Sequence, residues 1–264
     1  MTSAPPPAFA LWAAACLAAP RAADLELTVV VPVKNEAPNV GPLVGEIVCA
    51  LAGHRFEIVY VDDGSSDDTA AALAAAAAAH PELRVLRQAQ SAGQSAALRS
   101  GILAARAPLI ATLDGDGQND PADLPTLLAT FGADDAPPTL GLVGGDRSKN
   151  RRDVWVKRRS SRIANAVRRR MLRDQTPDSG CGLKVFRRDA YLLLPFFDHQ
   201  HRFLPALFLR EGFVVRSVAV GHRPRGGGKS NYGTLDRLAV GIVDLFGVGW
   251  LRRRRRPVSV REED

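Results

Sequence analysis

The chain has 264 residues, of which 46% are hydrophobic and 24% are charged, a composition typical of a globular protein with a sizeable core. Its three cysteines, Cys16, Cys49 and Cys181, are widely spaced and odd in number. This spacing excludes a disulfide framework or a zinc motif and favours a reducing, cytosolic setting. No apolar run reaches the roughly 18–20 uninterrupted residues that a membrane span requires.

The formal net charge of +7 is unevenly distributed along the chain. Residues 147–173 contain twelve Lys and Arg against a single acid, Asp153, and Arg252–Arg256 add five more positive charges. These two segments together carry +16, which leaves −9 for the rest of the chain. An acidic body with two basic segments favours an anionic surface or a polyanionic ligand, either membrane lipid or nucleic acid. A solvated helix face is the alternative.

The two ends of the chain carry apolar segments of different kinds. Residues 4–24 have an apolar middle with no positive charge before it. We therefore expect residues 1–24 to be a poorly ordered extension or a surface-seeking segment rather than a signal peptide. Residues 238–256 are apolar, interrupted by Asp244 and glycines, and end in five arginines. This pattern favours an interfacial helix with an anchor for anionic headgroups; a core helix with a soluble basic tail is the alternative.

Short β-branched and apolar runs alternate with helical patterns in the first part of the chain. We predict buried strands at 26–33, 56–61, 107–113 and 141–146, and helices between them at 39–52, 67–79 (with Ser66 as N-cap) and 93–106. Strands that alternate with helices predict an α/β fold, a mostly parallel central sheet with helices on both faces.

The sequence becomes strongly basic after Asp146. Ile163, Val167 and Met171 recur at helical spacing beside a cationic face, which predicts an amphipathic basic helix at 154–172; an ordinary surface helix is the alternative. The elements expected after it are a turn at 176–182, a strand at 183–186, a helix near 188–196, a strand near 213–220 and a flexible cationic loop at 222–233.

Polar loops follow the first three predicted strands, at 34–36 (KNE), 62–68 (DDGSSDD) and 114–120 (DGDGQND). In such sheets ligands bind outside the carboxyl ends of the strands, so we expect these loops to meet at one rim and form a binding site. Asp67 and Asp68 are better explained as residues that serve the start of the following helix.

Three common ligand-binding motifs are excluded by the sequence. An EF-hand that began at Asp114 would need Gly and Glu where the chain has Asn119 and Pro125. The Walker-like ending GKS (228–230) has Arg223 where the first glycine belongs. No G-x-G-x-x-G follows the first strand, so the dinucleotide fingerprint is absent from the sequence.

An Asp-Gly-Asp sequence at the end of a strand remains to be explained. Asp114 and Asp116 lie two apart, so their carboxylates project to the same side of an extended segment, and Gly115 lets a bulky ligand approach. Hard oxygen donors suit Mg²⁺ or Mn²⁺, which completes its shell with substrate phosphate oxygens. A divalent cation that carries a diphosphate is therefore expected here; a tight turn made by Asp and Gly is the alternative.

The motifs VVVPVKNEAPNV, VDDGSSDDT, GQSAALRSGI and LDGDGQNDP, in this order, resemble glycosyltransferase family 2, an inverting, nucleotide-sugar-dependent class with the GT-A fold. The later motifs GGDRSKNRRD, DSGCGLKVFRRD and HRPRGGGKSNYG narrow the resemblance to the polyprenyl-phosphate branch, which includes dolichol-phosphate mannosyltransferase and undecaprenyl-phosphate sugar transferases. The resemblance covers residues 26–250. Many bacterial relatives differ by two long membrane helices after the catalytic domain.

The resemblance implies a role for each matching residue. The nucleotide sugar would be bound by Pro32, Glu36, Asp62, Asp63, Gln94, Asp114 and Gly115. The metal would be held by Asp114, Asp116 and Gln118, and the acceptor phosphate or departing diphosphate by Arg147, Arg225, Lys229 and Ser230. Asp116 and Asp178 would be catalytic, with Asp178 close to the reacting sugar. An Asx-type turn with Gly180 is the alternative for Asp178, and Cys181 is better explained as a packing residue.

The resemblance further implies transfer of a hexose from a UDP- or GDP-sugar to a polyprenyl phosphate, with Mg²⁺ or Mn²⁺. A phosphate monoester carries about 1.5–2 negative charges at neutral pH, so we expect Asp178 to orient or screen rather than deprotonate. A soluble or carbohydrate acceptor is the alternative, and a non-catalytic polyanion binder a remote one. Nucleic acid is not expected, because the basic segments lack interleaved aromatic residues.

The expected organisation has three parts. Residues 1–24 form the extension, residues 25–233 the GT-A catalytic domain, and residues 234–264 an interfacial helix with a basic tail. Within the catalytic domain, 25–146 would bind the nucleotide sugar and 147–233 the acceptor. The protein would then act at an anionic membrane surface, peripherally on the cytoplasmic face. A membrane subunit or a homo-oligomer is left open.

Overall fold

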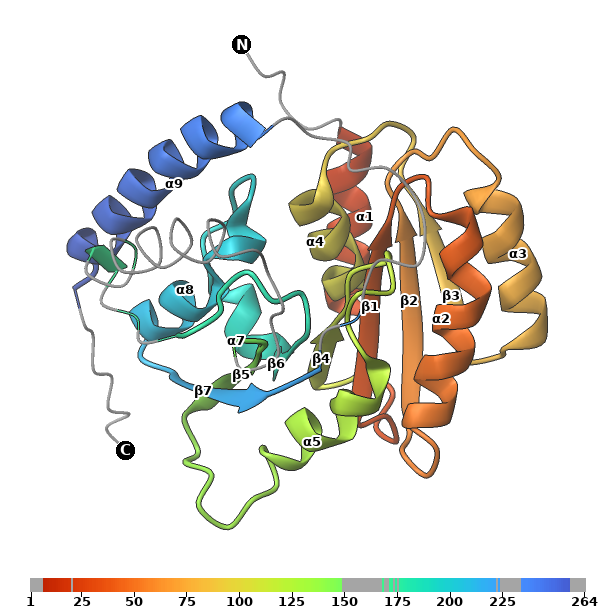
Figure 1. Ribbon diagram of the computed structural model, residues 1–264, viewed down its shortest axis with the longest axis horizontal. Coiled ribbons are helices and arrows are strands. Elements are labelled where there is room, and N and C mark those ends of the chain that lie inside the picture. The colour runs from red at the N-terminus through yellow and green to blue at the C-terminus, as the bar shows by residue number, and fades with distance from the viewer. Residues whose placement is uncertain are drawn as a thin grey trace.

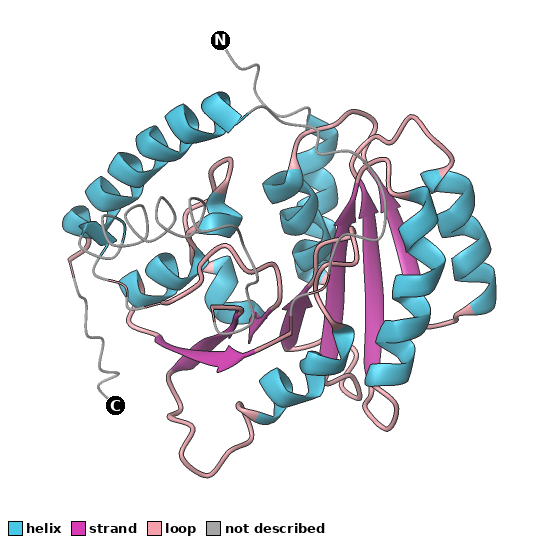
Figure 2. Ribbon diagram, viewed as in Figure 1, coloured by secondary structure: helices cyan, strands magenta, loops and turns pink. Residues whose placement is uncertain are grey.

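A seven-stranded sheet forms the centre of the computed structural model, which describes residues 7–19, 21–148, 168, 171–172, 174, 176–221, 223 and 234–256. The strand order is β3-β2-β1-β4-β6-β5-β7 (Figure 1). Among these strands only β6 is antiparallel to its neighbours. Helices cover both faces (Figure 2), so the predicted α/β fold with a mostly parallel sheet is confirmed.

The strands are β1 (Leu27–Val33), β2 (Phe56–Asp62), β3 (Leu83–Arg87), β4 (Leu109–Thr112), β5 (Leu140–Asp146), β6 (Lys184–Arg187) and β7 (Val214–Ala219). The α-helices are α1 (Pro7–Ala18), α2 (Ala37–Ala50), α3 (Thr69–Ala79), α4 (Gln94–Ala104), α5 (Leu124–Ala129), α7 (Arg188–Leu192), α8 (Leu204–Arg210) and α9 (Thr234–Arg254). Two short 3-10 helices are η1 (Pro121–Asp123) and η2 (Gln200–Arg202).

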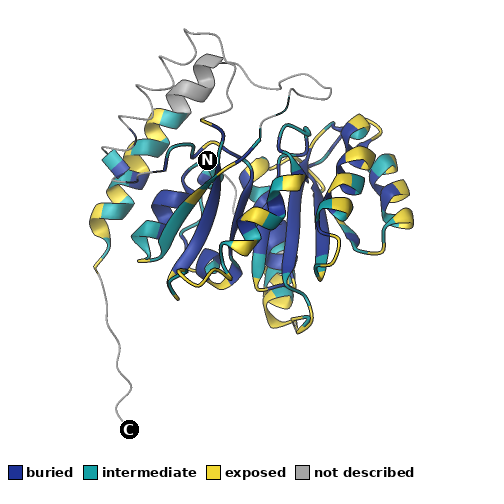
Figure 3. Ribbon diagram, turned by 60° about the horizontal axis from the view of Figure 1, so that its bottom comes forward, coloured by how far each residue is buried: buried dark blue, intermediate teal, exposed yellow. Residues whose placement is uncertain are grey.

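Alternate residues of the central strands enter two cores, one on each face of the sheet. Val29 and Val31 belong to the core beneath α2 and α3, whereas Val30 belongs to the core beneath α4. All three are fully buried, and Figure 3 shows the central strands as a continuous buried layer. Because both faces are covered, the strands are unbroken apolar runs in the sequence.

Helix α4 lies close against the sheet because its contact face is made of small residues. A Cβ atom on Gly101 would lie 2.4 Å from Cγ1 of Val30 and 3.1 Å from Cγ2 of Val61, so only glycine fits there. Ala97, one turn earlier, is fully buried. This close packing brings the first turn of α4, with Gln94, to the carboxyl ends of the strands.

Three α-helices and one strand were not predicted from the sequence. β3 is an edge strand in which Arg84 and Arg87 interrupt a short apolar segment, so it lacks the buried run used to find the others. Residues 7–18 of the segment expected to be poorly ordered form α1, which packs on α4. There the guanidinium carbon of Arg99 lies 5.9 Å from the ring centre of Phe9. Helices α5 and α8 are the other two.

Helix α3 begins two residues later than predicted, and Ser66 is not its N-cap. The backbone N–H of Ser66 donates to Oδ1 of Asn35 at 2.9 Å, and Asp68 occupies the N-cap position. Oδ1 of Asp67 accepts a hydrogen bond from the N–H of Thr69 at 3.0 Å. The predicted role of Asp67 at the start of the helix is thus confirmed, while contact with the neighbouring loop draws Ser66 away.

Two predicted segments lie largely outside the described residues. Of the basic helix predicted at 154–172 only Arg168, Met171 and Leu172 are described, and all three are helical. Of the cationic loop at 222–233 only Arg223 is described. Helix α9 confirms a helix near the carboxyl-terminal end. Among the helices of the described part, none is long and apolar enough to cross a membrane.

Arg188 holds the carboxyl end of α4 and provides a test of stability. Its buried guanidinium donates from Nε to the carbonyl of Ile102 and from Nη2 to that of Leu103, both at 2.9 Å. We expect Arg188→Ala to lower the free energy of unfolding, measured by urea titration, by about 2–3 kcal/mol, because buried carbonyls lose a charged donor. The control is Arg187→Ala, which breaks an exposed pair with Asp189 and should cost about 1 kcal/mol or less. Equal losses would contradict this account.

Candidate functional site

The loops after β1 and β2 interlock at the carboxyl edge of the sheet, the upper edge in Figure 1. Asn35 has a φ of 56°, in the left-handed region where an Asn side chain is favoured. Its N–H donates to Oγ of Ser65 at 3.0 Å. The N–H of Glu36 donates to Oγ1 of Thr69 at 2.9 Å, and its buried carboxylate accepts from Asn39 at 2.6 Å. The predicted meeting of these two loops is therefore confirmed.

Asp63 builds the turn that leads into α4. Its Oδ1 accepts from the N–H of Ala92 at 2.7 Å, and its Oδ2 accepts from the N–H of Gly93 at 3.0 Å and from Oγ of Ser91 at 2.8 Å. Asp62 likewise accepts from the N–H of Ser65 at 2.8 Å. Both carboxylates are almost fully buried and are engaged with the protein itself. Their contact with a donor nucleotide stays a prediction.

The acidic loop 114–120 follows β4 and lies against the end of β1. A Cβ atom on Gly115 would lie 2.4 Å from Cγ1 of Val33 and 3.0 Å from the carbonyl oxygen of Pro32, so glycine is required by this contact. The amide Nε2 of Gln94 donates to Oδ1 of Asp114 at 2.8 Å. Oδ1 of Asp116 accepts from the backbone N–H of Gln118 at 3.2 Å. The structure thus brings the predicted donor-binding residues to one place.

Strand β6 brings a cation that sequence analysis did not select. Lys184 pairs with Thr112 in the sheet register, two residues before Asp114, and only 5% of its surface is exposed. A Cβ atom on Gly182 would lie 2.1 Å from Oδ2 of Asp114, so the carboxylate fills the space that glycine leaves. A lone lysine within an apolar strand, directly after the DSGCG turn, is the signal that could have identified Lys184.

Burial disfavours the charged forms of both Asp114 and Lys184, and each charge is stabilised by the other. Burial, and next the nearby carboxylate of Asp116, raise the pKa of Asp114, while Lys184 and Arg147 act in the opposite direction. Burial lowers the pKa of Lys184, and the charges of Asp114 and Asp178 oppose that shift. The site is therefore a compact set of opposite charges supplied by both halves of the sheet.

Arg147 and Asp178 form a two-point ion pair beside this group. Nε of Arg147 donates to Oδ2 of Asp178 at 2.8 Å, and Nη2 donates to Oδ1 at 3.2 Å. Burial opposes the charge of Arg147, but the hydrogen bond to Asp178 and the nearby negative charges of Cys181, Asp178 and Asp114 together outweigh it, so the pKa of Arg147 is raised. Both predicted residues are thus in the site, bound to each other. The other predicted phosphate-binding residues, Arg225, Lys229 and Ser230, lie outside the described residues.

A second unpredicted contact joins η2 to the first turn of α4. Oγ of Ser95 lies 2.7 Å from Nδ1 of His201. Burial lowers the pKa of His201 to about 3, so the ring is neutral near pH 7. Ser95 follows Gln94 directly, and this contact supports the turn from which Gln94 reaches Asp114. The two residues are 106 positions apart, and no local pattern marks either one.

The donor set fits a divalent cation that shares its shell with a substrate. Within the described ranges no group of three His, Cys, Asp or Glu is placed to hold a metal by itself. Asp114 and Asp116 nevertheless supply two carboxylates close enough for one to raise the pKa of the other. Mg²⁺ is usually bound through one or two carboxylates plus substrate phosphates and water. These two residues match that requirement.

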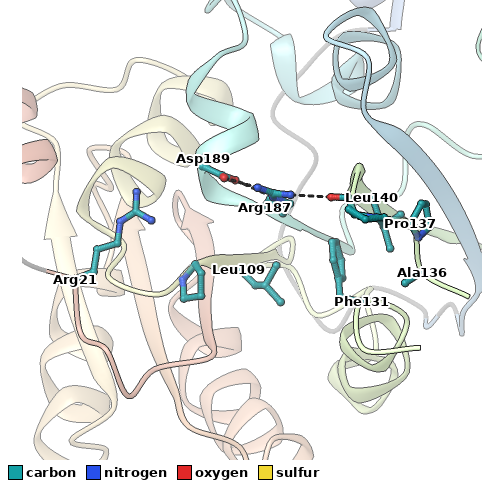
Figure 4. Close-up of a pocket in the computed structure, with 10 residues that line it drawn as sticks. Arg21, Leu109, Phe131, Ala136, Pro137, Leu140, Arg187 and Asp189 are labelled. Carbon is teal, nitrogen blue, oxygen red and sulfur yellow. Dashed lines mark hydrogen bonds and ion pairs between the residues drawn. The ribbon is translucent and has the colours of Figure 1, made fainter. Parts of the chain in front are cut away.

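A separate cavity lies at the other end of the strands (Figure 4). Its walls include Leu109 and Leu140, the first residues of β4 and β5, together with Phe131. The guanidinium of Arg187 at its rim is held by Asp189, from Nη2 at 2.6 Å, and by the carbonyl of Pro138. Because Asp114 follows the carboxyl end of β4, this cavity is not part of the acidic site.

Comparison with solved structures identifies the fold. The chain superposes on glucosyl-3-phosphoglycerate synthase from Mycobacterium tuberculosis with a TM-score of 0.64 at 20% identity, over 87% of this chain and 80% of that one. It superposes on the mannosyltransferase PcManGT from Pyrobaculum calidifontis, solved with GDP-Man and Mn²⁺, with a TM-score of 0.62 at 21% identity, over 95% and 72%. The fold is that of a GT-A glycosyltransferase, as predicted.

Sequence comparison identifies the family. Residues 28–193 match the model of Glycosyl transferase family 2. The chain is 37% identical over 243 residues to the dodecaprenyl-phosphate galacturonate synthase of Rhizobium johnstonii, covering 89% of this chain and 70% of that protein. It is 33% identical over 215 residues to the undecaprenyl-phosphate 4-deoxy-4-formamido-L-arabinose transferase of Edwardsiella ictaluri, covering 79% and 63%. The chain belongs to glycosyltransferase family 2 and is a glycosyltransferase.

Substitution of Gly182 provides a test of the site in which no charged residue is replaced. We expect Gly182→Ala to displace the carboxylate of Asp114, because the new methyl group would overlap it, and to weaken Mn²⁺-dependent nucleotide binding about tenfold or more. The control is Gly180→Ala, whose Cβ would lie 3.7 Å from Oδ1 of Asp178, an ordinary contact. Isothermal titration with UDP and GDP measures both. Unchanged binding by Gly182→Ala would contradict the placement of Asp114.

Proposed function

We propose that this glycosyltransferase moves a hexose, with inversion, from a nucleoside-diphosphate sugar to a polyprenyl phosphate at a membrane surface, with Mg²⁺ or Mn²⁺. The observation that carries the proposal is the pair Asp114 and Asp116 at the carboxyl edge of the sheet, with Lys184 and Arg147 supplying opposing charge from the other half. The two relatives described above are both named for polyprenyl-phosphate substrates, and this supports the acceptor class.

On the donor side, Asp114 and Asp116 would hold the cation together with the diphosphate. When bound, the cation would neutralise the charge that develops on the departing nucleoside diphosphate. Gln94 keeps Asp114 oriented through its amide hydrogen bond, and Gln118 closes the turn around Asp116. Pro32, Glu36, Asp62 and Asp63 would line the nucleotide end, where their loops are already interlocked before the donor arrives.

On the acceptor side, the chain needs to bind a phosphate rather than to create a nucleophile. The acceptor phosphate is already anionic, so no strong base is required. Because Asp178 holds Arg147 at two points, we infer that Asp178 acts by orienting this guanidinium toward phosphate. Arg225, Lys229 and Ser230 would add further phosphate contacts from the cationic segment.

Helix α9 supports the membrane part of the proposal. One side packs on the body of the protein, where Val248 is 1% exposed and Nε of Arg210 donates to the carbonyl of Leu251 at 3.1 Å. The other side leaves large apolar residues open, with Trp250 58% and Phe246 63% exposed, and Figure 3 shows this mixed burial. Five arginines follow at 252–256, which suits insertion beside anionic headgroups on the cytoplasmic face.

The reaction is tested by nucleotide release. A panel of UDP- and GDP-sugars is incubated with Mn²⁺ or Mg²⁺, with and without undecaprenyl phosphate in vesicles. We expect release only when both the metal and the lipid phosphate are present, and the active donor identifies base and sugar. Nucleotide release that is the same with and without the lipid would indicate a soluble acceptor. No release from any donor, together with salt-sensitive binding to polyanions, would point to the non-catalytic alternative.

Two variants provide the matched control for that assay. Asp116→Asn should lower turnover at least about 100-fold, because it weakens the electrostatic stabilisation of the leaving group. Asp178→Asn should keep measurable turnover, because Asn retains an oxygen that can accept from Arg147. Complete loss in Asp178→Asn at unchanged donor affinity would instead identify an obligatory base. Thermal unfolding checks that both variants are folded.

Membrane association is tested by vesicle sedimentation at low salt. We expect the wild-type chain to bind vesicles that contain anionic lipid. Exchange of Arg253 and Arg254 for Gln should weaken binding by roughly 30-fold, since each near-surface arginine contributes about 1 kcal/mol. The matched control exchanges Arg55 and Arg106, both exposed near the amino-terminal ends of strands, and should bind like wild type. Equal binding by the two double variants would contradict the assignment to α9.

A further inference from the structure

Arg223 joins three segments that are far apart in the sequence. Its guanidinium donates to both oxygens of Asp120, with Nη2 to Oδ1 at 2.6 Å and Nε to Oδ2 at 3.1 Å. Its remaining nitrogen, Nη1, donates to Oε2 of Glu46 on α2 at 2.8 Å. All three nitrogens of the planar guanidinium therefore donate hydrogen bonds, two to the acidic loop and one to α2.

The backbone of the same segment adds two further contacts to the acidic loop. The N–H of Arg223 donates to the carbonyl of Gln118 at 3.1 Å. The N–H of Gly221 donates to Oδ2 of Asp123 at 2.8 Å. The chain that leaves β7 therefore lies alongside loop 118–123 and is tied to it by main-chain as well as side-chain bonds.

These contacts continue to the proposed metal ligand. Gln118 accepts from Arg223 through its carbonyl and donates through its N–H to Oδ1 of Asp116 at 3.2 Å. Asp120 also accepts from the N–H of Ala122 at 3.0 Å and so caps η1. The Asp116–Asp120 turn is therefore held at two points, at its middle through the carbonyl of Gln118 and at its end through the carboxylate of Asp120.

Stability alone does not account for this arrangement. The side chains of Arg223 and Glu46 are 39% and 45% exposed, and exposed ion pairs contribute little to the free energy of unfolding. The contacts instead restrict the geometry of one turn. Restriction matters most where two carboxylates must face a single cation at short, narrowly defined distances.

We propose that Arg223 is a positioning residue that sets the Asp116–Asp120 turn for metal and diphosphate binding. The inference rests on the proposed function, since it assigns the metal and diphosphate to the acidic loop. It requires nothing of the acceptor lipid.

The test is the Mn²⁺ dependence of UDP and GDP binding, followed by isothermal titration without lipid. We expect Arg223→Gln to raise the Mn²⁺ concentration for half-maximal binding about tenfold, the usual effect of removing an outer-shell partner. Its thermal midpoint should stay close to wild type. The control is Arg216→Gln on β7, which breaks a similar pair with Asp135 (Nη1 to Oδ1, 2.9 Å) that does not touch the acidic loop. It should leave the Mn²⁺ dependence unchanged.

Asp120→Asn provides the second arm, because Asn can still cap η1 but loses the charge. Asp120→Asn and the double variant with Arg223→Gln should show the same shift as Arg223→Gln alone, since all three break the Arg223–Asp120 ion pair and the bond from Arg223 to Glu46 does not reach the acidic loop. Additive shifts, or a wild-type Mn²⁺ dependence in Arg223→Gln, would overturn the inference while leaving the proposed function intact. If the wild-type chain binds neither nucleotide with either metal, the donor site itself is wrong and the inference is overturned with it.

Discussion

The antiparallel pairing of β6 with β4 is the contact on which the site depends. It places Lys184 opposite Thr112, two residues before Asp114, and Gly182 leaves the space that the Asp114 carboxylate occupies. Without this strand the first half of the sheet would offer two adjacent carboxylates and no internal cation. The reversal of a single strand therefore completes a charge arrangement that parallel strands alone do not provide.

Burying these charged groups is energetically unfavourable, and the attraction between opposite charges offsets that penalty. Burial raises the pKa of Asp114 and lowers that of Lys184, so each charge would be disfavoured if the other were removed. Arg147 and Asp178 repeat the pattern as a buried pair. A site built in this way is organised before a ligand binds, which reduces the reorganisation that a departing diphosphate would otherwise require.

The loops of the rim are held by hydrogen bonds within the protein, from backbone N–H groups and from side chains. Asp63 orders the turn before α4, Asn35 links the first two loops, and Arg223 ties the chain after β7 to the acidic loop. Several acidic residues that look like ligand contacts in the sequence are thus engaged with the protein. Their conservative replacement would act on the position of neighbouring groups as well as on direct contacts with a nucleotide.

The sequence by itself determined the α/β class, the strands with continuous apolar runs, and the three polar loops, because doubly covered strands have an unbroken apolar pattern and their carboxyl ends share one edge. Its motifs also led to the family. It did not determine β3, whose short apolar segment is interrupted by two arginines, or α1. Only the tertiary structure decided that Lys184 lies near Asp114, that Asp178 holds Arg147, and that His201 contacts Ser95. These contacts join residues between 31 and 106 positions apart, or across strands of opposite direction. Side-chain partners at such separations are set by strand order and register, which no local pattern encodes.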